Sequence, residues 1–463
     1  MAQPTPALQA LWTDPLYPDS ASLDRSAKTI WKSTVQPERQ FLVLDGVPWL
    51  FPEPTRALVE WRERSLQLLQ FLESEVADLK IQANETSSKL TRIRLSELRR
   101  LKILHLEYVR RTLEPLKVHD CKRLIPGPEF YRLPLRQGLL GYAPNAVRDW
   151  SPTAFAGENE RLLELVTQQM SPEFSGSQRI AVLGCGAGRL AYDLAQMGHR
   201  VLGLDLNPLL LLAAKEFAFG GAPRTSADFP VQAIDPDRPG REVKLGGFAP
   251  ASEEKLSFAL ADVYQIPLAP ASVDLVITPW LIDILPRRFS ELATEIARVL
   301  RPEGGWINAG SWRFDFRSES ENLSLPEAEE VAVGYFRPLR TQRASMPYLQ
   351  SSLDAHRREE VLTCFSWQRN SSPSPHTRPR ADDRIEWLRD PQMSIPALPV
   401  FSAAAATHRA MSELLKEVDG RRSIQDLAAT LRSRHGIAEA EALVAVSAFF
   451  DRFLQDRRFR DFS

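Results

Sequence analysis

One stretch constrains the fold of this 463-residue chain more than any other: residues 179–208, RIAVLGCGAGRLAYDLAQMGHRVLGLDLNP. Its apolar residues 180–183 have the length of a buried strand, and residues 190–197 carry apolar side chains at helical spacing. A second apolar run, 201–204, ends in Asp205. The pattern predicts a β-strand, a helix and a second, parallel β-strand, with a glycine-rich loop at the carboxyl end of the first strand.

The glycine-rich loop indicates a nucleotide-like ligand, because a Cβ atom there would keep a ligand away from the backbone. Dinucleotide folds use G-x-G-x-x-G, whose third glycine would fall at Arg189, whereas here it is Gly188. The G-x-G-x-G spacing is typical of proteins that bind S-adenosylmethionine (SAM). Asp205 suits a ribose diol, since a carboxylate can accept two hydroxyl hydrogen bonds. A bound dinucleotide and a purely structural turn are the alternatives.

Composition narrows the class of protein. The net charge of −1 gives no overall attraction to nucleic acid or to a membrane surface. No apolar run approaches the roughly 20 residues of a membrane span, and the first residues lack the pattern of a secretory signal. Cys121, Cys185 and Cys364 lie too far apart for a zinc motif or a disulfide framework. We therefore expect a cytoplasmic protein without a metal, a nucleic-acid partner or a membrane partner; the sequence does not indicate its oligomeric state.

The length of the chain predicts two or three domains, and its composition changes along the sequence. In the N-terminal arm, FLVLDGVPWLFPEP (41–54) predicts a short strand, a turn at Asp45-Gly46 and an exposed extended segment. Between a predicted helix at 209–219 and a predicted strand at 257–263, residues 220–247 predict a long polar insertion. The predicted segments are an arm (1–54), a helical hairpin (55–120), a catalytic domain (121–370), a linker rich in proline and serine (371–400) and a small helical domain (401–463).

Seven separated segments sharpen the prediction for the catalytic domain. They are VRDWS (147–151), GCGAGRLA (184–191), GLDLNP (203–208), ALADVY (259–264), ITPWLID (277–283), GGWINAGSWRF (304–314) and MPYL (346–349). In this order they resemble the carnosine N-methyltransferase-like family of class I SAM-dependent methyltransferases. The resemblance, which covers residues 145–368, implies an α/β fold with a mostly parallel, Rossmann-like sheet. It also implies SAM as cofactor and methyl transfer to nitrogen.

The same resemblance implies where the cofactor binds. Arg148 can pair bidentately with the SAM carboxylate, although a surface or capping role is the alternative for Arg148 and for Asp262. The family has glutamine where this chain has Asn145, and glutamate where it has Asp205. The implied cofactor-binding residues are Asn145, Arg148, Gly184, Gly186, Gly188, Asp205, Asp262 and Val263.

For the methyl acceptor, the resemblance implies Asp283 as the catalytic residue, which orients an N–H group of the acceptor. The resemblance also implies that Asp315 and Tyr348 shape the acceptor pocket. Independently of it, the π face of the Trp280 ring could line a pocket for a cationic acceptor. A helix cap is the alternative for Asp283, and a core position is the alternative for Tyr348 and Trp280. The family has a histidine where this chain has Asp315. We therefore expect the reaction to be shared with the family but the acceptor to differ.

The C-terminal segment, MSELLKEVDGRRSIQDLAATL followed by a helix ending in FLQDR, resembles the PqqD-like modules, which bind peptides and have a winged-helix-type fold. A helical cap on the catalytic domain is the alternative. The sequence thus predicts a SAM-dependent N-methyltransferase acting on an imidazole or amine nitrogen of a small molecule or peptide. One alternative is a methyltransferase of a ribosomal peptide pathway that recruits a leader peptide through residues 401–463. The other is a non-catalytic SAM-binding scaffold.

Overall fold

The computed structural model describes residues 8–20, 22–118, 139–153, 155, 157–170, 172–314, 316, 319–371, 413–419, 421–436 and 438–455. The chain divides into two compact units, Met1–Ala381 and Asp382–Ser463, and each is described by itself. Among the helices of these described ranges, none combines the length and the apolar character needed to cross a membrane.

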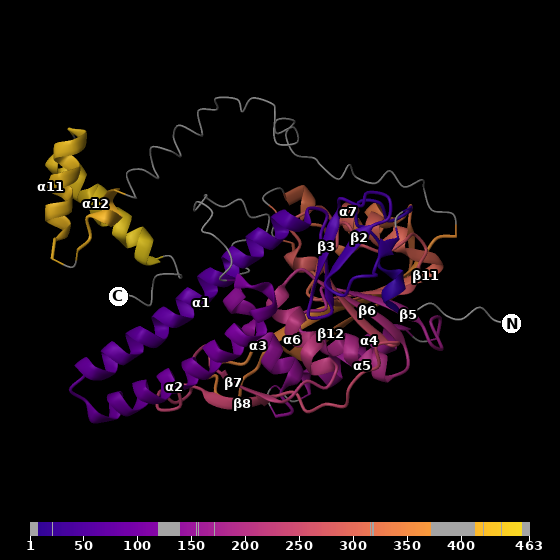
Figure 1. Ribbon diagram of the computed structural model, residues 1–463, viewed down its shortest axis with the longest axis horizontal. Helices are drawn as coiled ribbons and strands as arrows, with labels where there is room; N and C mark the ends of the chain where they lie inside the picture. The colour runs from indigo at the N-terminus through magenta and orange to yellow at the C-terminus, as the bar shows by residue number, and fades with distance from the viewer. Residues whose placement is uncertain are drawn as a thin grey trace. The chain divides into compact units, whose positions relative to one another are not determined.

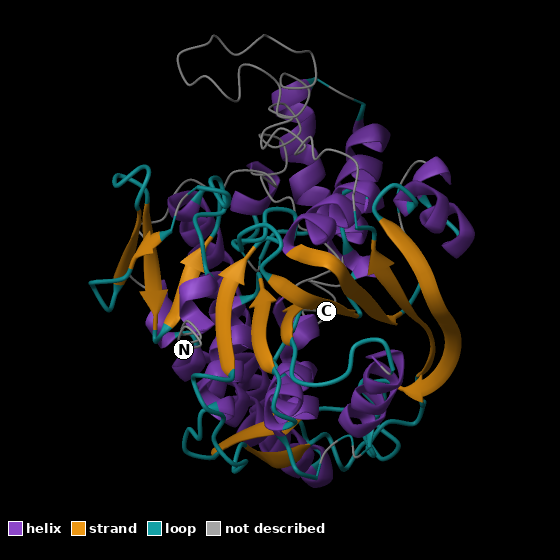
Figure 2. Ribbon diagram, turned by 90° about the vertical axis from the view of Figure 1, so that its right-hand side faces the viewer, coloured by secondary structure: helices purple, strands orange, loops and turns teal. Residues whose placement is uncertain are grey.

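The first unit is built on an eleven-stranded sheet and a separate two-stranded sheet (Figure 2). In their order across the large sheet, the strands are β1 (Leu23–Asp24), β2 (Ile30–Ser33), β3 (Gln40–Leu44), β4 (Val47–Leu50), β9 (Leu256–Ala261), β6 (Arg200–Asp205), β5 (Arg179–Leu183), β10 (Val273–Pro279), β11 (Leu300–Gly310), β13 (Glu359–Arg369) and β12 (Phe336–Pro347). The strands from β4 to β11 run parallel, and the pairs at both ends are antiparallel. The predicted mostly parallel α/β fold is confirmed.

Helices cover both faces of this sheet. They are α1 (Pro54–Glu85), α2 (Lys89–Thr112), α3 (Leu139–Trp150), α4 (Glu158–Met170), α5 (Arg189–Gln196), α6 (Pro208–Ala218), α7 (Phe289–Val299) and α8 (Leu325–Ala332). Successive β5 side chains point to opposite faces, as a strand requires. Val182 packs in a core with Leu165 of α4 and Leu194 of α5, while Leu183 packs in a second core with Ile296 of α7.

The order of the strands indicates where on the sheet a ligand binds. Sequential connections run from β5 outward through β6 to β9 on one side, and through β10 to β11 on the other. In open α/β sheets, ligands bind outside the carboxyl ends of the strands where the order reverses, here between β5 and β10. The loop after β5 lies at this position, and so do Asp205 at the end of β6 and Trp280 just after β10.

The N-terminal arm differs from its prediction. Residues 47–50, expected to be exposed, form β4, all four of whose residues are buried. The strand pairs in parallel with β9, with Trp49 opposite Leu260. Trp49 packs in the core that contains Val182, and Leu50 packs in the core that contains Leu183. Because both faces of β4 are covered, its apolar residues do not alternate with polar ones as they would in a half-exposed strand, so this pattern was absent.

The N-terminal helices and the insertion pack against each other. In Figure 1, α1 and α2 run side by side as a hairpin. The polar insertion contains two strands, β7 (Arg224–Asp228) and β8 (Arg241–Leu245), which pair antiparallel and were not predicted. It contacts α2 through the buried His105, whose Nδ1 lies 3.4 Å from Ser226 Oγ, and through the 2.9 Å ion pair of Arg100 with Glu242.

In the second unit, the structure describes two long helices, α11 (Ile424–His435) and α12 (Glu439–Gln455). Ser423 and Asp426 form a capping box at the start of α11, which ends at Gly436 with φ +65°. Leu427 and Val446 belong to a small core between the two helices.

Candidate active site

A cavity lies at the carboxyl ends of the parallel strands, and the glycine loop forms one of its walls. Gly184 and Gly186 line it with φ of +66° and +57°, a backbone conformation that favours glycine. A Cβ on Gly184 would lie 2.8 Å from Cδ1 of Leu281, whereas a Cβ on Gly186 would meet no atom within 4 Å. The backbone at Gly186 is therefore open to a ligand.

Gly188, predicted to contact the cofactor, does not line this cavity. Its φ is +86°, and a Cβ there would lie 2.7 Å from Ala214 Cβ and 3.0 Å from a ring carbon of Phe258. Gly188 thus permits close packing of the loop and α5 against α6 and β9.

Asp205 supplies a buried carboxylate beside the loop. Its two oxygens accept hydrogen bonds from the backbone N–H groups of Gly186 and Asn207, each at 2.8 Å. Burial raises the pKa of Asp205, and these backbone donors oppose the rise. Each carboxylate oxygen has a further lone pair, so Asp205 can still accept from a diol at the cavity.

Of the two residues predicted to form the adenine site, Asp262 and Val263, only Val263 lines the cavity. Val263 is buried and lines the cavity. The Asp262 side chain does not line it; its carboxylate accepts a 2.9 Å hydrogen bond from the backbone N–H of Tyr264. Its contact with the adenine ring stays a prediction. The apolar residues that line the cavity are Leu162, Leu190, Leu206, Leu210, Val263, Leu281, Ile284, Leu285 and Pro286.

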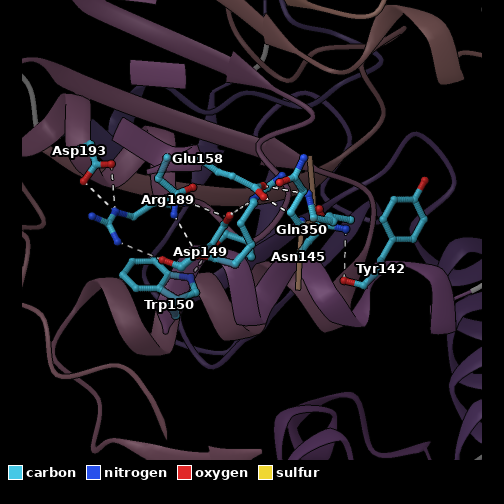
Figure 3. Close-up of polar contacts among 12 residues, drawn as sticks. Tyr142, Asn145, Asp149, Trp150, Glu158, Arg189, Asp193 and Gln350 are labelled. Atoms are coloured by element: carbon cyan, nitrogen blue, oxygen red, sulfur yellow. Dashed lines mark hydrogen bonds and ion pairs between the residues drawn. The ribbon is translucent and has the colours of Figure 1, made fainter. Parts of the chain in front are cut away.

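Helix α3 contributes a charged wall, part of which is drawn in Figure 3. Arg148 donates from Nε to the buried Asp149 at 2.7 Å, and its guanidinium carbon lies 5.5 Å from the ring centroid of Trp280. Burial alone would lower the pKa of Arg148, but Asp149 and other neighbours raise it, so this group carries a positive charge. Asn145 lines the cavity and donates to the carbonyl of Tyr142 at 3.3 Å.

Aromatic rings close the cavity beyond β10. The rings of Trp280 and Tyr348 lie 5.1 Å apart, and both residues line the cavity. Trp280 has φ +41°, a conformation uncommon for residues other than glycine. Its indole N–H donates to Glu360 Oε2 at 2.9 Å, and the Ser311 hydroxyl donates to the same oxygen at 2.9 Å.

Asp283 lies in a short 3₁₀ helix after β10, Ile282–Ile284. It does not itself line the cavity, but its neighbours Leu281 and Ile284 do. Its Oδ1 is buried and has no hydrogen-bond partner within the described residues. Burial, and then the nearby Glu360, raise the pKa of Asp283 to about 7. The alternative of a helix cap is not supported, because the N-cap of α7 is Arg288. Asp315, the other predicted acceptor residue, lies outside the described residues.

Residues 182–307 match the sequence profile of a family described as a methyltransferase domain. This part of the chain is a SAM-dependent methyltransferase domain. No curated protein matches the chain. Of the predicted site residues, the matched segment contains the glycine loop, Asp205, Asp262, Val263, Trp280 and Asp283, whereas Asn145, Arg148, Asp315 and Tyr348 lie outside it.

Several solved methyltransferase structures are similar to this chain, with low sequence identity. A SAM-dependent methyltransferase from Methanosarcina mazei is 13% identical over 43% of this chain and 95% of its own, with a TM-score of 0.31. The N-methyltransferase NodS from Bradyrhizobium japonicum is 15% identical over 46% of this chain and 87% of its own (TM-score 0.30). Magnesium protoporphyrin IX methyltransferase from Synechocystis is 15% identical over 46% of this chain and 80% of its own (TM-score 0.29).

The cavity of the methyltransferase domain fits its cofactor SAM. The open backbone at Gly186 and the spare lone pairs of Asp205 suit the ribose, and Val263 with its apolar neighbours suits the adenine ring. Arg148 makes no side-chain hydrogen bond to the described residues other than that to Asp149, so its terminal nitrogens can pair with a carboxylate.

Several residues that line the cavity were not assigned to the site by the sequence analysis. Trp61 of α1, Tyr142 and Asp149 of α3, and Asn159 of α4 all line it. Asp149 lies inside the VRDWS segment, so that motif could have suggested it. Trp61 had no such signal, because it belongs to the apolar stripe of a helix far from the domain in sequence. Within the described residues, no group of three or more histidine, cysteine, aspartate or glutamate side chains is arranged to hold a metal ion.

Proposed function

We propose that the chain transfers the methyl group of SAM to an imidazole or amine nitrogen of a small molecule or peptide. The observation that carries this proposal is the Asp283 carboxyl group, whose buried Oδ1 has no partner within the described residues and whose pKa is raised to about 7. A buried polar atom without a partner is costly, so its retention beside a cavity favours a role with a ligand.

Nitrogen as acceptor fits this carboxyl group. SAM, when bound, supplies an electrophilic methyl group on a positively charged sulfur. An amine or imidazole nitrogen develops positive charge as it attacks, and an attached proton must then leave. An ionised Asp283 can accept that N–H as a hydrogen bond, orient the lone pair and stabilise the charge. A pKa of about 7 lies close to that of an imidazole, which favours proton transfer between the two groups.

The aromatic wall supports the same acceptor class. The ring faces of Trp280 and Tyr348 attract cations, and an acceptor nitrogen becomes more positive as the methyl group arrives. Glu360 fixes the Trp280 indole through its N–H, so the ring is held before an acceptor binds. An oxygen or sulfur acceptor that attacks as an anion becomes neutral on methylation and would draw less benefit from this wall.

The carnosine-like substrate class is part of this proposal. It is supported by the order of the seven segments that resemble the carnosine N-methyltransferase-like family, and carnosine is the natural first acceptor to test. Recruitment of a leader peptide by residues 401–463 stays a prediction, as do the segment boundaries.

A cytoplasmic location is also proposed. It is supported by the described cysteines, Cys185 and Cys364, which are free and buried.

The test compares Asp283→Asn with the wild type, using methyl-labelled SAM and a panel of imidazoles and amines that includes L-carnosine. Asparagine cannot accept the proton, so we expect kcat to fall by about 100-fold or more while the Kd for S-adenosylhomocysteine stays unchanged. Glu330→Gln removes an exposed carboxylate from α8 and serves as the control, with wild-type activity expected. Wild-type kcat in Asp283→Asn, or no labelled product from any acceptor, would contradict the proposal.

A further inference from the structure

The segment that follows Tyr348 is held by two buried carboxylates from different parts of the fold. Leu349, the next residue, has φ +49°, which is strained for a branched side chain. The backbone N–H groups of Leu349 and Gln350 each donate to the carboxylate of Glu158, at 2.9 Å. Glu158 is 2% exposed and begins α4, where the helix dipole also favours a negative charge. The Glu158–Gln350 contact is visible in Figure 3.

The second carboxylate belongs to the insertion. The Ser351 hydroxyl donates to Oδ2 of Asp228, the last residue of β7, at 2.8 Å, and both residues are 4% exposed. Arg241 of β8 donates to the same oxygen from Nε at 3.0 Å and so helps to hold the Asp228 side chain in place. Charge-assisted hydrogen bonds of this kind are roughly twice as strong as neutral ones.

Backbone contacts extend this attachment further along the segment. The N–H of Ile234, in the insertion, donates to the carbonyl of Leu353 at 2.9 Å, and the N–H of Ala355 donates to the carbonyl of Gln232 at 2.8 Å. The insertion is attached in turn to α2 through the buried His105, as described above. Residues 349–355 are thus fixed from both sides, immediately after a residue that lines the cavity.

We propose that Glu158 and Asp228 are positioning residues for the methyl acceptor, because they hold residues 349–355 and so fix the Tyr348 ring in the cavity wall. In this way the insertion determines acceptor affinity without touching the acceptor. The proposal rests on the function proposed above, in which Tyr348 faces the acceptor. The cofactor contacts at Gly186 and Asp205 are not part of this attachment, so the donor and acceptor sites should respond differently to its loss.

The experiment uses the full chain with Ser351→Ala, which removes the hydroxyl that binds Asp228 but leaves the Asp228–Arg241 ion pair. The matched control is Glu242→Gln, which changes an exposed residue of β8 and breaks only the ion pair with Arg100. Two readouts are taken: hydrogen exchange of the amides in residues 349–355, and the KM for L-carnosine with labelled SAM.

We expect faster exchange in Ser351→Ala at residues 349–355 and a KM for carnosine raised about five-fold, the value of one hydrogen bond. The kcat and the Kd for S-adenosylhomocysteine should stay at wild-type values, and Glu242→Gln should resemble the wild type throughout. Asp228→Asn should act in the same direction with a larger effect, because it also weakens the ion pair with Arg241. Adding Ser351→Ala to it should change the KM little further, since the hydrogen bond between these two residues is then already weakened.

The positioning role is overturned if Ser351→Ala exchanges as slowly as Glu242→Gln, or if kcat falls while KM stays constant. If the wild type does not methylate carnosine, the acceptor proposal is weakened, and the exchange readout alone then decides whether Asp228 positions the segment.

Discussion

Gly186 and Gly188 both have a left-handed backbone conformation, but their surroundings differ. Substitution of one should therefore weaken ligand binding, and substitution of the other should lower the stability of the fold. Gly188→Ala places a Cβ 2.7 Å from Ala214 Cβ, so we expect a lower unfolding temperature. Gly186→Ala meets no atom within 4 Å and carries only the cost of its positive φ, roughly 1 kcal/mol. Its main effect should be weaker binding of S-adenosylhomocysteine. Thermal unfolding and calorimetric titration of both variants check this, and equal effects on the two quantities would contradict it.

Also at the residue scale, the negative charge of Glu360 adds to the effect of burial in raising the pKa of Asp283. Activity that needs ionised Asp283 should rise with pH through about 7 and then level off, because the carboxyl group loses its proton over that range. Glu360→Gln removes the negative charge that helps raise this pKa. The rise in kcat/KM should therefore move to lower pH. Glu359→Gln, which changes the exposed neighbouring residue, is the control. A pH profile of Glu360→Gln that coincides with the wild type would show that Glu360 does not act on Asp283.

The sequence predicted those site residues whose roles depend on the local chain. The glycines of the loop and Asp205 were predicted from the pattern of a β-strand, a helix and a second β-strand. Asn145, Arg148, Trp280 and Tyr348 were predicted from short segments. Except for Gly188 of the loop, all of these residues line the cavity. Glu360 could not be predicted, because its role arises where β13 lies near the end of β10, and no local pattern marks that contact.

At the scale of elements, β4 shows how burial on two faces hides a strand. Trp49 is fully buried and donates from its indole to the Pro54 carbonyl at 2.9 Å. If β4 belongs to the sheet, Trp49→Ala should cost about 3 kcal/mol or more through the cavity it leaves. Val35→Ala, at a half-exposed position of the same arm, should change stability by less than about 0.5 kcal/mol. Thermal unfolding followed by circular dichroism compares them, and equal midpoints would contradict the role of β4.

Near the other end of the sheet, two strands were not predicted from the sequence. Apart from β4, the sequence predicted the parallel strands, which are β5, β6, β9, β10 and β11, because their apolar runs are short and bounded by turns. It did not predict β12 or β13, and the burial pattern of β12 is mostly exposed or half-exposed. Because β12 is an edge strand, its sequence lacks the continuous apolar run of a central strand.

At the scale of the whole molecule, every residue that lines the cavity belongs to the first unit. A chain that ends after Ala381 should therefore bind S-adenosylhomocysteine as tightly as the full chain and methylate small acceptors at the same rate. If the second unit recruits a peptide, the shortened chain should lose activity on peptide acceptors alone. Calorimetry and the labelled-methyl assay test this, and loss of S-adenosylhomocysteine binding would contradict a site built within the first unit.

The central claim is that the methyl group goes to nitrogen at a site formed by Asp283, Trp280 and Tyr348. The most direct measurement is the NMR spectrum of the product formed from SAM carrying a ¹³C-labelled methyl group and the acceptor panel. We predict a methyl signal bonded to nitrogen, strongly reduced with Asp283→Asn. A product methylated on oxygen, sulfur or carbon, formed equally well by Asp283→Asn, would contradict the account.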